Sequence, residues 1–205
     1  MNKEQILDLY AEAYKLVLDR GFEWEIKMVE GYDWRTTTME QFYHQYVWCV
    51  LSAGCSNAAC QSMFDDFFNL DQNPMVIKHN GKRLALIKAI SEHMLWYLEW
   101  KRLAKINLQQ SIDYLGTLFF IGPVTKYHFT RNIGIDCAKP DRHMERLAIE
   151  YGFGKPQTTK SYVYDKEVND MCKYVAGQRG DKIGVVDVIF WRYCNLVGTR
   201  ELINA

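Results

Sequence analysis

The sequence predicts an all-α fold with two helical lobes around a central helix, turn and helix. Three observations support this prediction. Apolar residues recur at helical spacing through most of the chain, and no convincing alternation of polar and apolar residues marks a strand. In addition, residues 115–151 follow the pattern helix, tight turn, helix, short loop, helix, and the other helices are organised around this stretch.

Length and composition fit such a fold. The 205 residues suffice for one large domain or for two small lobes that share a core. Hydrophobic residues make up 48% of the chain, which argues against wholesale disorder. The formal net charge is zero, which argues against a strongly basic surface for unspecific nucleic-acid binding, although residues 122–146 are mildly basic.

The N-terminal half is predicted to be mostly helical. We expect an amphipathic helix over residues 3–20, whereas the less regular residues 22–37 are expected to form a connection packed by its aromatic side chains. Thr38 is the expected N-cap of a helix over residues 39–53, because Gln41 three positions later completes a capping box. Further helices are predicted over residues 57–69, 82–94 and 95–105, and residues 108–118 lead into the central turn.

The C-terminal region contains two more regular segments. Residues 160–177 are predicted to form a helix. The strongly apolar residues 181–196 are rich in β-branched side chains, so periodicity alone leaves open whether they form a strand or a buried helix. No internal repeat or low-complexity run is present.

The central stretch contains clear turn and cap residues. Gly122 suits a tight turn because it can adopt a positive φ, and Pro123 suits the first turn of the helix that follows. Gly134 is expected to end that helix. Asp141, directly after Pro140, lies where the N-cap of the next helix is expected.

This stretch resembles the hairpin region of the helix-hairpin-helix DNA glycosylases, the base-excision family. Their hairpin reads roughly Leu-Pro-Gly-Ile-Gly-x-x-Thr-Ala, and an aspartate follows beyond a short loop at the start of a helix. Phe119 and Phe120 stand where that family has Pro and Gly, and the resemblance covers about residues 39–195. The matching residues are Leu118, Ile121, Gly122, Thr125 and Asp141.

The resemblance implies a division of the chain, which would form one catalytic unit over residues 1–205. One helical lobe would cover residues 38–133 and end in the hairpin at residues 115–133. The second lobe would combine residues 1–37 with residues 134–205. In this fold the apolar C-terminal segment would be a helix.

The resemblance also assigns the chemistry. An aspartate at position 141 is by itself explained by helix capping, but at this distance from the hairpin the resemblance implies that Asp141 is the catalytic carboxylate. Bifunctional members of the family carry a lysine two residues after the last hairpin glycine, where this chain has Val124. Lys126 lies two residues further on and would face another direction. We therefore expect base release without efficient strand cleavage.

DNA contacts follow from the same resemblance. The hairpin would hold a phosphate through Gly122 and the N–H groups of Val124 and Thr125, with Lys126 beside them. In that family a side chain after the helix that matches residues 39–53 fills the gap left by a flipped base, and Gly54 stands at its position here. Asn57 or another loop would then fill the gap, and a place near a helix cap explains Asn57 equally well. Candidates for a base pocket, each of which packing or capping would also explain, are Trp24, Trp34, Tyr43, Tyr127, His143 and Trp191.

Three functions remain open at this point. The first, which we favour, is a monofunctional DNA glycosylase that acts on a damaged or modified base in double-stranded DNA. The second is a transferase that hypermodifies activated thymine in DNA, since phage-encoded relatives of this type tend to read Phe-Ile-Gly-Pro in the hairpin, as residues 120–123 do. The third is a non-catalytic DNA-binding module, against which Asp141 argues.

Cysteine usage predicts neither a metal nor a cofactor. The six cysteines form no Cys-x-x-Cys pair, and only Cys172 and Cys194 lie in the region where some glycosylases of this family bind an iron–sulfur cluster. The sequence shows no signal peptide and no long apolar run. We therefore expect a monomeric, soluble, cytoplasmic protein of bacterial or phage type, with reduced thiols and with DNA as its partner.

Overall fold

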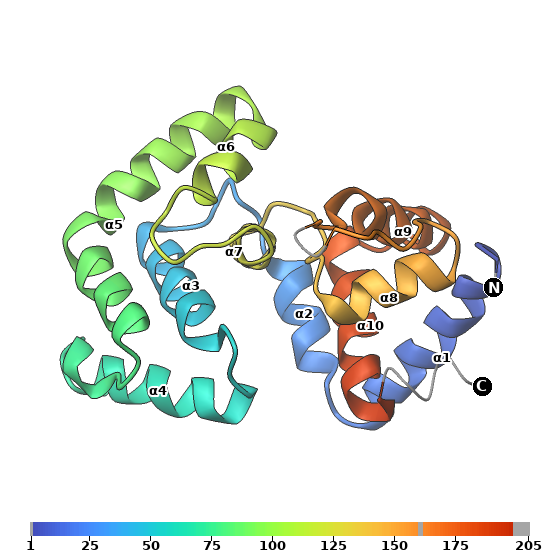
Figure 1. Cartoon of the computed structure of the whole chain (residues 1–205), viewed down its shortest axis with the longest axis horizontal. Coiled ribbons are helices and arrows are strands. Elements are labelled where there is room, and N and C mark those ends of the chain that lie inside the picture. Colours follow the sequence, from blue (N-terminus) through green and yellow to red (C-terminus); the bar gives the residue numbers. More distant parts are fainter. Residues whose placement is uncertain (1, 160–161, 199–205) are drawn as a thin grey trace. The chain divides into compact units, whose positions relative to one another are not determined.

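A computed structural model describes residues 2–159 and 162–198 of the chain. The described residues form ten α-helices and one short 3-10 helix, with no strand among them, which confirms the all-α prediction (Figure 1). They divide into two compact units. The first unit combines Met1–Tyr32 with Asp136–Ala205, and the second is Asp33–Ile135.

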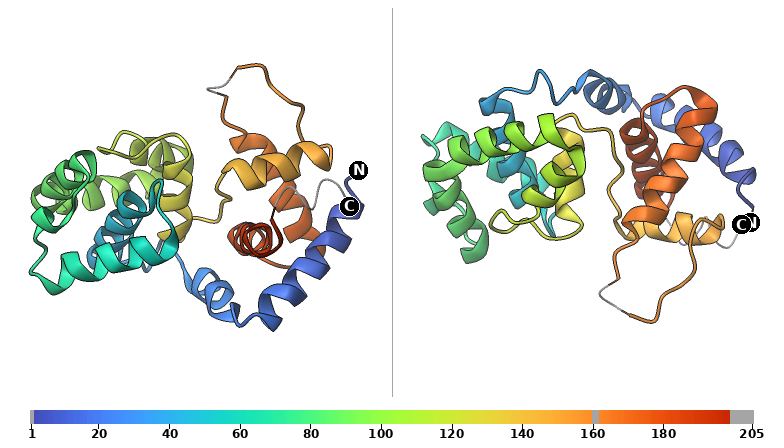
Figure 2. Two further views of the ribbon diagram at one scale, coloured as in Figure 1. Left: turned by 60° about the horizontal axis from the view of Figure 1, so that its bottom comes forward. Right: turned by 90° about the horizontal axis from the view of Figure 1, so that it is seen from above.

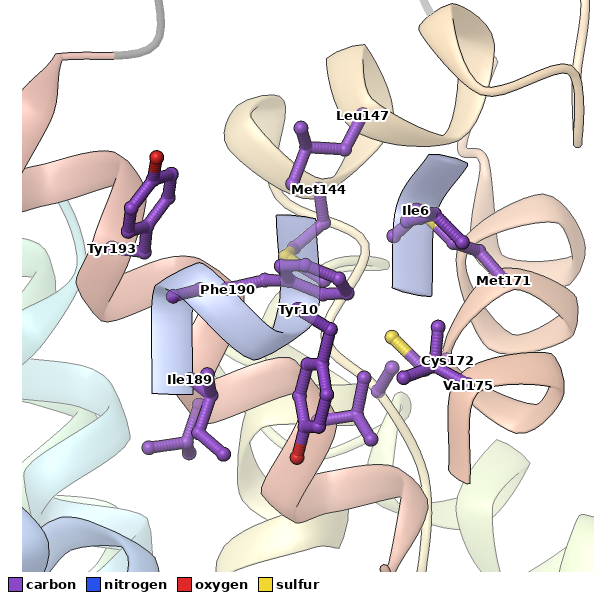
Figure 3. Packing of buried hydrophobic residues seen from close by; sticks show 14 of the residues in the cluster. Ile6, Tyr10, Met144, Leu147, Met171, Cys172, Val175, Ile189, Phe190 and Tyr193 are labelled. Carbon is purple, nitrogen blue, oxygen red and sulfur yellow. The ribbon is translucent and has the colours of Figure 1, made fainter. Parts of the chain in front are cut away.

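The first unit is built around its C-terminal helix. Helix α10 contacts each of the other helices of the unit, and the two views of Figure 2 show it, in red, surrounded by them. Figure 3 shows side chains from α1, α8, α9 and α10 meeting in the core of this unit. The helices of the unit are α1 (Gln5–Asp19), α2 (Glu23–Gly31), α8 (Arg142–Glu150), α9 (Asp165–Arg179) and α10 (Ile183–Val197).

The second unit contains the hairpin. Its core is aromatic: the Phe42 ring lies 5.3 Å from the Trp100 ring and 4.9 Å from the Phe129 ring, measured between centroids. Such pairs add stabilisation to the burial of the rings themselves. The helices of this unit are α3 (Met39–Ser52), α4 (Asn57–Asn69), η1 (Pro74–Val76), α5 (Asn80–Ile106), α6 (Leu108–Leu115) and α7 (Thr125–Asn132).

Several sequence-based predictions of helices are confirmed. Thr38 caps α3 through a complete capping box with Gln41, as the sequence predicts. The ambiguous segment 181–196 is helical, and its residues from Gly184 to Phe190 are all buried. A helix contacted by four others leaves almost no face for water, which explains why its sequence shows no amphipathic period. Part of the helix predicted over residues 160–177 lies outside the described residues, and its described part starts at Asp165.

Two predictions of local structure are wrong. Residues 22–37 are not simply a connection, because α2 forms over Glu23–Gly31 with Ile26 and Val29 buried on one face. Residues 82–105 form one continuous helix rather than two, because no proline or glycine interrupts them after Gly81.

The two chain segments that bound the second unit are fastened to each other. The Trp34 N–H donates to the Gly134 carbonyl oxygen at 3.2 Å, and the Thr37 hydroxyl donates to the Ile133 carbonyl oxygen at 2.9 Å. Gly134 has φ +91°, and a Cβ there would lie 2.3 Å from the Trp34 nitrogen. We call this arrangement of residues 33–37 and 133–134 the clasp, and only glycine fits its closest point.

A membrane-spanning helix would need about 20 apolar residues. Within the described residues, no helix combines the required length with the required hydropathy.

Candidate active site

The hairpin is the turn between α6 and α7. Its left-handed residue is Phe120, with φ +68°, and Gly122 has no positive φ, so the expectation that Gly122 supplies this conformation is wrong. A bulky residue at positive φ is strained, and the surrounding contacts must hold it in place. They do so here: the Tyr46 hydroxyl donates to the Phe119 carbonyl oxygen at 2.6 Å, and the Phe120 ring lies against His79 and Gly81.

Gly122 lies at an open position of the turn. A Cβ built on Gly122 would meet no atom within 4 Å, so the fold itself does not require glycine there. The Lys126 N–H donates to the Gly122 carbonyl oxygen at 2.9 Å, which starts α7. Within the described part of the chain, the N–H groups of Val124 and Thr125 donate no backbone hydrogen bond. The first turn of α7 therefore presents N–H groups beside a residue without a side chain, which suits the binding of an anion.

The two other residues expected to contact DNA lie differently. Lys126 pairs with Asp113 of α6, with 3.3 Å between the Nζ and Oδ1 atoms, and its ammonium lies 5.0 Å from the centre of the Tyr127 ring. Asn57 is the exposed first residue of α4, whose N-cap is Ser56. Asn57 is therefore not the cap itself, and its side chain is left at the surface.

Asp141 is the N-cap of α8, in the first unit. Its Oδ1 atom accepts hydrogen bonds from the backbone N–H groups of His143, at 3.0 Å, and Met144, at 3.4 Å. Its Oδ2 atom lies 3.7 Å from Nζ of Lys139. Since Oδ1 alone satisfies the helix N-terminus, the cap role and a chemical role do not compete for the same oxygen.

Several cations lie near the start of α8. Lys139, Arg142 and Arg146 all lie close enough to His143 to lower its pKa, whereas Asp141 raises it. Burial raises the pKa of the Cys194 thiol of α10 to about 12, with Asp141 adding to the effect. The carboxylate therefore has one cation, Lys139, at its second oxygen and two arginines on the helix that it caps, and its side chain keeps 15% of its surface exposed. Such a setting attracts a polyanion towards a fixed carboxylate.

His143 gives the first unit a pH dependence. Burial, the largest effect, lowers its pKa from 6.5. The unfolded chain then binds more protons than the folded chain between the lowered pKa and 6.5, so the free energy of unfolding falls as the pH drops below 6.5. We expect the thermal midpoint of unfolding to fall in this range and the His143→Gln variant to lose this fall. His44→Gln, in the second unit, is the matched control, and an unchanged pH profile in His143→Gln would contradict the prediction.

The base-pocket candidates of the first unit lie on two helices besides α8. Trp24, on α2, is 58% exposed, and Trp191 is a half-buried residue of α10. Arg192 stacks on the Trp191 ring at 5.0 Å and on the Phe22 ring at 4.0 Å, and it pairs with the buried Glu25. Trp24 therefore offers a free aromatic face, whereas Trp191 is already covered by a guanidinium group.

Most of the base-pocket candidates in the second unit are buried in its core. Tyr43 is 5% exposed, its hydroxyl donates to Gln72 at 2.9 Å, and burial raises its pKa to about 12. Tyr127 is 7% exposed on α7. The ring of Trp34, at the clasp, lies under the cations of Arg35 and Lys101. Burial of Tyr43 and Tyr127 limits their use as stacking platforms for a base.

Sequence reasoning missed Lys139 as the cation beside Asp141. The only signal was its position two residues before the aspartate, across Pro140, and nothing in that spacing fixes the direction of a lysine side chain. The sequence also gave no sign of the ion pair between Glu25 and Arg192, which are distant along the chain. Among the described residues, no three His, Cys, Asp or Glu side chains cluster closely enough to hold a metal ion.

The fold of this chain is similar to that of proteins of known structure. No family model matches the sequence, and no curated protein matches it either. Two solved structures are similar. The 8-oxoguanine DNA glycosylase of Thermotoga maritima has a TM-score of 0.70 and 19% identity, with 97% of this chain and 98% of that chain covered. The 8-oxoguanine glycosylase/lyase of Methanocaldococcus jannaschii, in complex with DNA containing 8-oxoguanine, has a TM-score of 0.62 and 17% identity, with 89% and 95% covered. The chain therefore has the all-α fold of the helix-hairpin-helix DNA glycosylases.

Proposed function

We propose that the protein is a monofunctional DNA glycosylase, which releases a damaged or modified base from double-stranded DNA and leaves an abasic site. The observation that carries the proposal is the geometry of Asp141. One carboxylate oxygen is fixed by two backbone N–H groups at the start of α8, while the other faces Lys139. The carboxylate is thus held in one orientation, in a chain with a DNA glycosylase fold.

The proposed reaction breaks the bond between C1′ of the sugar and the base nitrogen. The sugar develops positive charge as the base departs, and the Asp141 carboxylate would stabilise this charge or accept a proton from the attacking water. Lys139 would keep the carboxylate oriented through the 3.7 Å contact with Oδ2. The base must leave the helical stack before reaction, and the exposed ring of Trp24 is the best available stacking surface in the first unit.

The hairpin would bind the DNA backbone. A phosphate oxygen would accept hydrogen bonds from the N–H groups of Val124 and Thr125, and the missing side chain at Gly122 would allow its approach. These contacts carry no sequence information, so the target is selected by the base itself. The Arg142 and Arg146 side chains, exposed on α8, would add contacts to phosphates. A protein with this function would act on DNA in the cytoplasm, free of any cofactor.

Strand cleavage would require an amine that attacks C1′ and forms a Schiff base. Val124 occupies the position of the amine in bifunctional glycosylases, and Lys126 is held by Asp113. We therefore propose that the product is an intact strand with an abasic site, cleaved only when alkali is added.

Base release from a panel of duplexes tests this proposal. Each duplex carries one alkylated, deaminated, oxidised or bulky modified base, with 8-oxoguanine included, and one half of each reaction is treated with alkali. We expect cleavage of one class of substrate after alkali only, with the free base identified by mass spectrometry. Cleavage without alkali would contradict the monofunctional proposal. Absence of base release from every duplex would contradict glycosylase activity altogether.

One observation favours a second candidate, the base-modifying transferase. Phe120 adopts φ +68° at the position where the glycosylase hairpin has glycine. The Phe-Ile-Gly-Pro sequence of residues 120–123 therefore forms an ordered turn of its own type. In such an enzyme Asp141 would deprotonate an incoming amine. The amine would displace the activating group of the thymine, so a strand that gains the mass of the amine and loses the mass of that group, without loss of a base, would support this candidate.

A further inference from the structure

Helix α5 is apolar on two opposite faces. One face packs into the second unit through residues such as Ala85, Ala89 and Trp100. The opposite face carries six large apolar side chains that are 40–63% exposed. We call this set the α5 stripe: Leu84, Ile87, Ile90, Met94, Leu95 and Leu98. A large exposed apolar patch on a folded protein commonly marks an interaction surface, so the α5 stripe is expected to have a partner.

The spacing of the stripe matches the seam of a helix pair. Leu84, Ile87, Ser91, Met94 and Leu98 follow one another in steps of three and four residues, the repeat with which two helices pack along each other. Ser91, at the centre, is small and exposed, so a second helix can approach closely there. Figure 1 shows α5 at the edge of its unit, with α3 and α7 on one side of it.

The size of the stripe fits a protein interface. With the exposed fractions given above, the six side chains present on the order of 600 Å² to solvent, against about 800 Å² for each partner of a stable complex. The polar side chains of Lys88 and Glu92, which flank the stripe, supply the remaining area. A patch of this size is at the upper end of what a soluble monomer exposes.

We infer that a second copy of this chain covers the α5 stripe, with the two α5 helices antiparallel about a two-fold axis at Ser91. This pairing brings Leu84 level with Leu98 of the second copy, and it places Ile87 within one residue step of the level of Met94 of the second copy, each twice by symmetry. It replaces the expectation of a monomer, and it does not depend on the proposed function.

Charge selects the antiparallel direction. Lys88 and Glu92 lie on the same flank of the stripe and pair within one chain at 3.8 Å. In the antiparallel dimer Lys88 of each copy also comes within reach of Glu92 of the other, so opposite charges meet across the interface. Arg102 and Lys105 continue the stripe towards the C-terminal end of α5, and Arg102 is paired with Glu99 at 2.6 Å. In a parallel dimer Lys105 would face its own copy and repel it.

The mass of the full chain in solution tests the inference. Sedimentation equilibrium is run up to about 100 µM, where a dimer of modest affinity is populated. We expect wild type to reach twice the chain mass of 24.1 kDa and Leu98→Glu to raise the dissociation constant at least about 100-fold, because it places a carboxylate in the seam. The matched control is Leu70→Glu, which changes a leucine that is 54% exposed outside the stripe and should leave the dimer intact.

A cysteine at the two-fold axis tests the geometry directly. Ser91→Cys should form a disulfide between two copies under mild oxidation, since residues on the axis meet their own symmetry mates. Ser62→Cys, on the exposed surface of α4, is the control, and wild type accounts for crosslinks through the exposed Cys55.

Each outcome decides the inference. A concentration-dependent dimer that Leu98→Glu dissociates and Ser91→Cys locks supports it. A wild type that stays at one chain mass overturns it, and so does a dimer that Leu98→Glu leaves intact. A dimer that Leu98→Glu dissociates but Ser91→Cys fails to lock overturns the antiparallel arrangement. Circular dichroism of each variant excludes unfolding as the cause of dissociation.

Discussion

Asp141→Asn should reduce base release by about 10³-fold while leaving the protein folded. Asparagine caps a helix as well as aspartate does, so its side-chain oxygen can still accept the N–H groups of His143 and Met144. It cannot carry the negative charge that the developing positive charge on the sugar requires. The measurement is single-turnover release of the base from the substrate that the duplex panel identifies, with binding to the same duplex measured in parallel.

The matched control is Asp136→Asn. Asp136 also accepts a backbone N–H at a helix start, that of Gly184 at 2.9 Å, so this variant makes the same chemical change at a second carboxylate that binds a helix N-terminus in the same unit. We expect it to keep wild-type rates. Equal losses in the two variants would mean that Asp141 acts through the fold, and full activity of Asp141→Asn would remove it from the mechanism.

Gly134→Ala should have the largest effect on stability. The new Cβ would lie 2.3 Å from the Trp34 nitrogen and 2.4 Å from the Asp33 carbonyl carbon, which are backbone atoms that cannot rotate away, and φ +91° strains any side chain. We expect a loss of about 3 kcal/mol or more in the free energy of unfolding. The thermal midpoint should fall by roughly 10 °C.

Gly177→Ala is the control for this experiment. Gly177 lies within α9 without a positive φ, and a Cβ there would meet nothing within 4 Å. Alanine should stabilise this helix by about 1 kcal/mol. A Gly134→Ala variant as stable as wild type would show that the clasp adjusts its backbone to admit a side chain.

The fold was predictable where local rules and burial agree. The capping box at Thr38 and Gln41 defines the start of α3 unambiguously, and the structure contains it. The single helix α5 was predicted as two, because its apolar residues lie on two opposite faces and give no single period. The sequence of α2 is similarly weak in period, and its contact with α10 decides its conformation.

The candidate site was predictable only in part, for a physical reason. That Asp141 would begin a helix follows from its neighbours along the chain, and the structure confirms this cap. The cation at Lys139 depends on a side-chain direction that spacing does not specify. The left-handed residue of the hairpin was assigned to Gly122 on propensity, whereas contacts from Tyr46, His79 and Gly81 hold Phe120 in that conformation.

The clasp has a consequence for how the chain folds. The second unit interrupts the first as an insertion of about a hundred residues, and bringing together the ends of a flexible loop of that length costs on the order of 4 kcal/mol. The hydrogen bonds of Trp34 and Thr37 join the two ends of the second unit. The entropic cost of closing the loop therefore arises when the second unit folds, and not when the first unit assembles. The first unit, whose Tyr32 and Asp136 both contact the start of α10, can then assemble as if a short loop linked them. The insertion is thereby tolerated, much as inserted domains with adjacent termini are tolerated in surface loops.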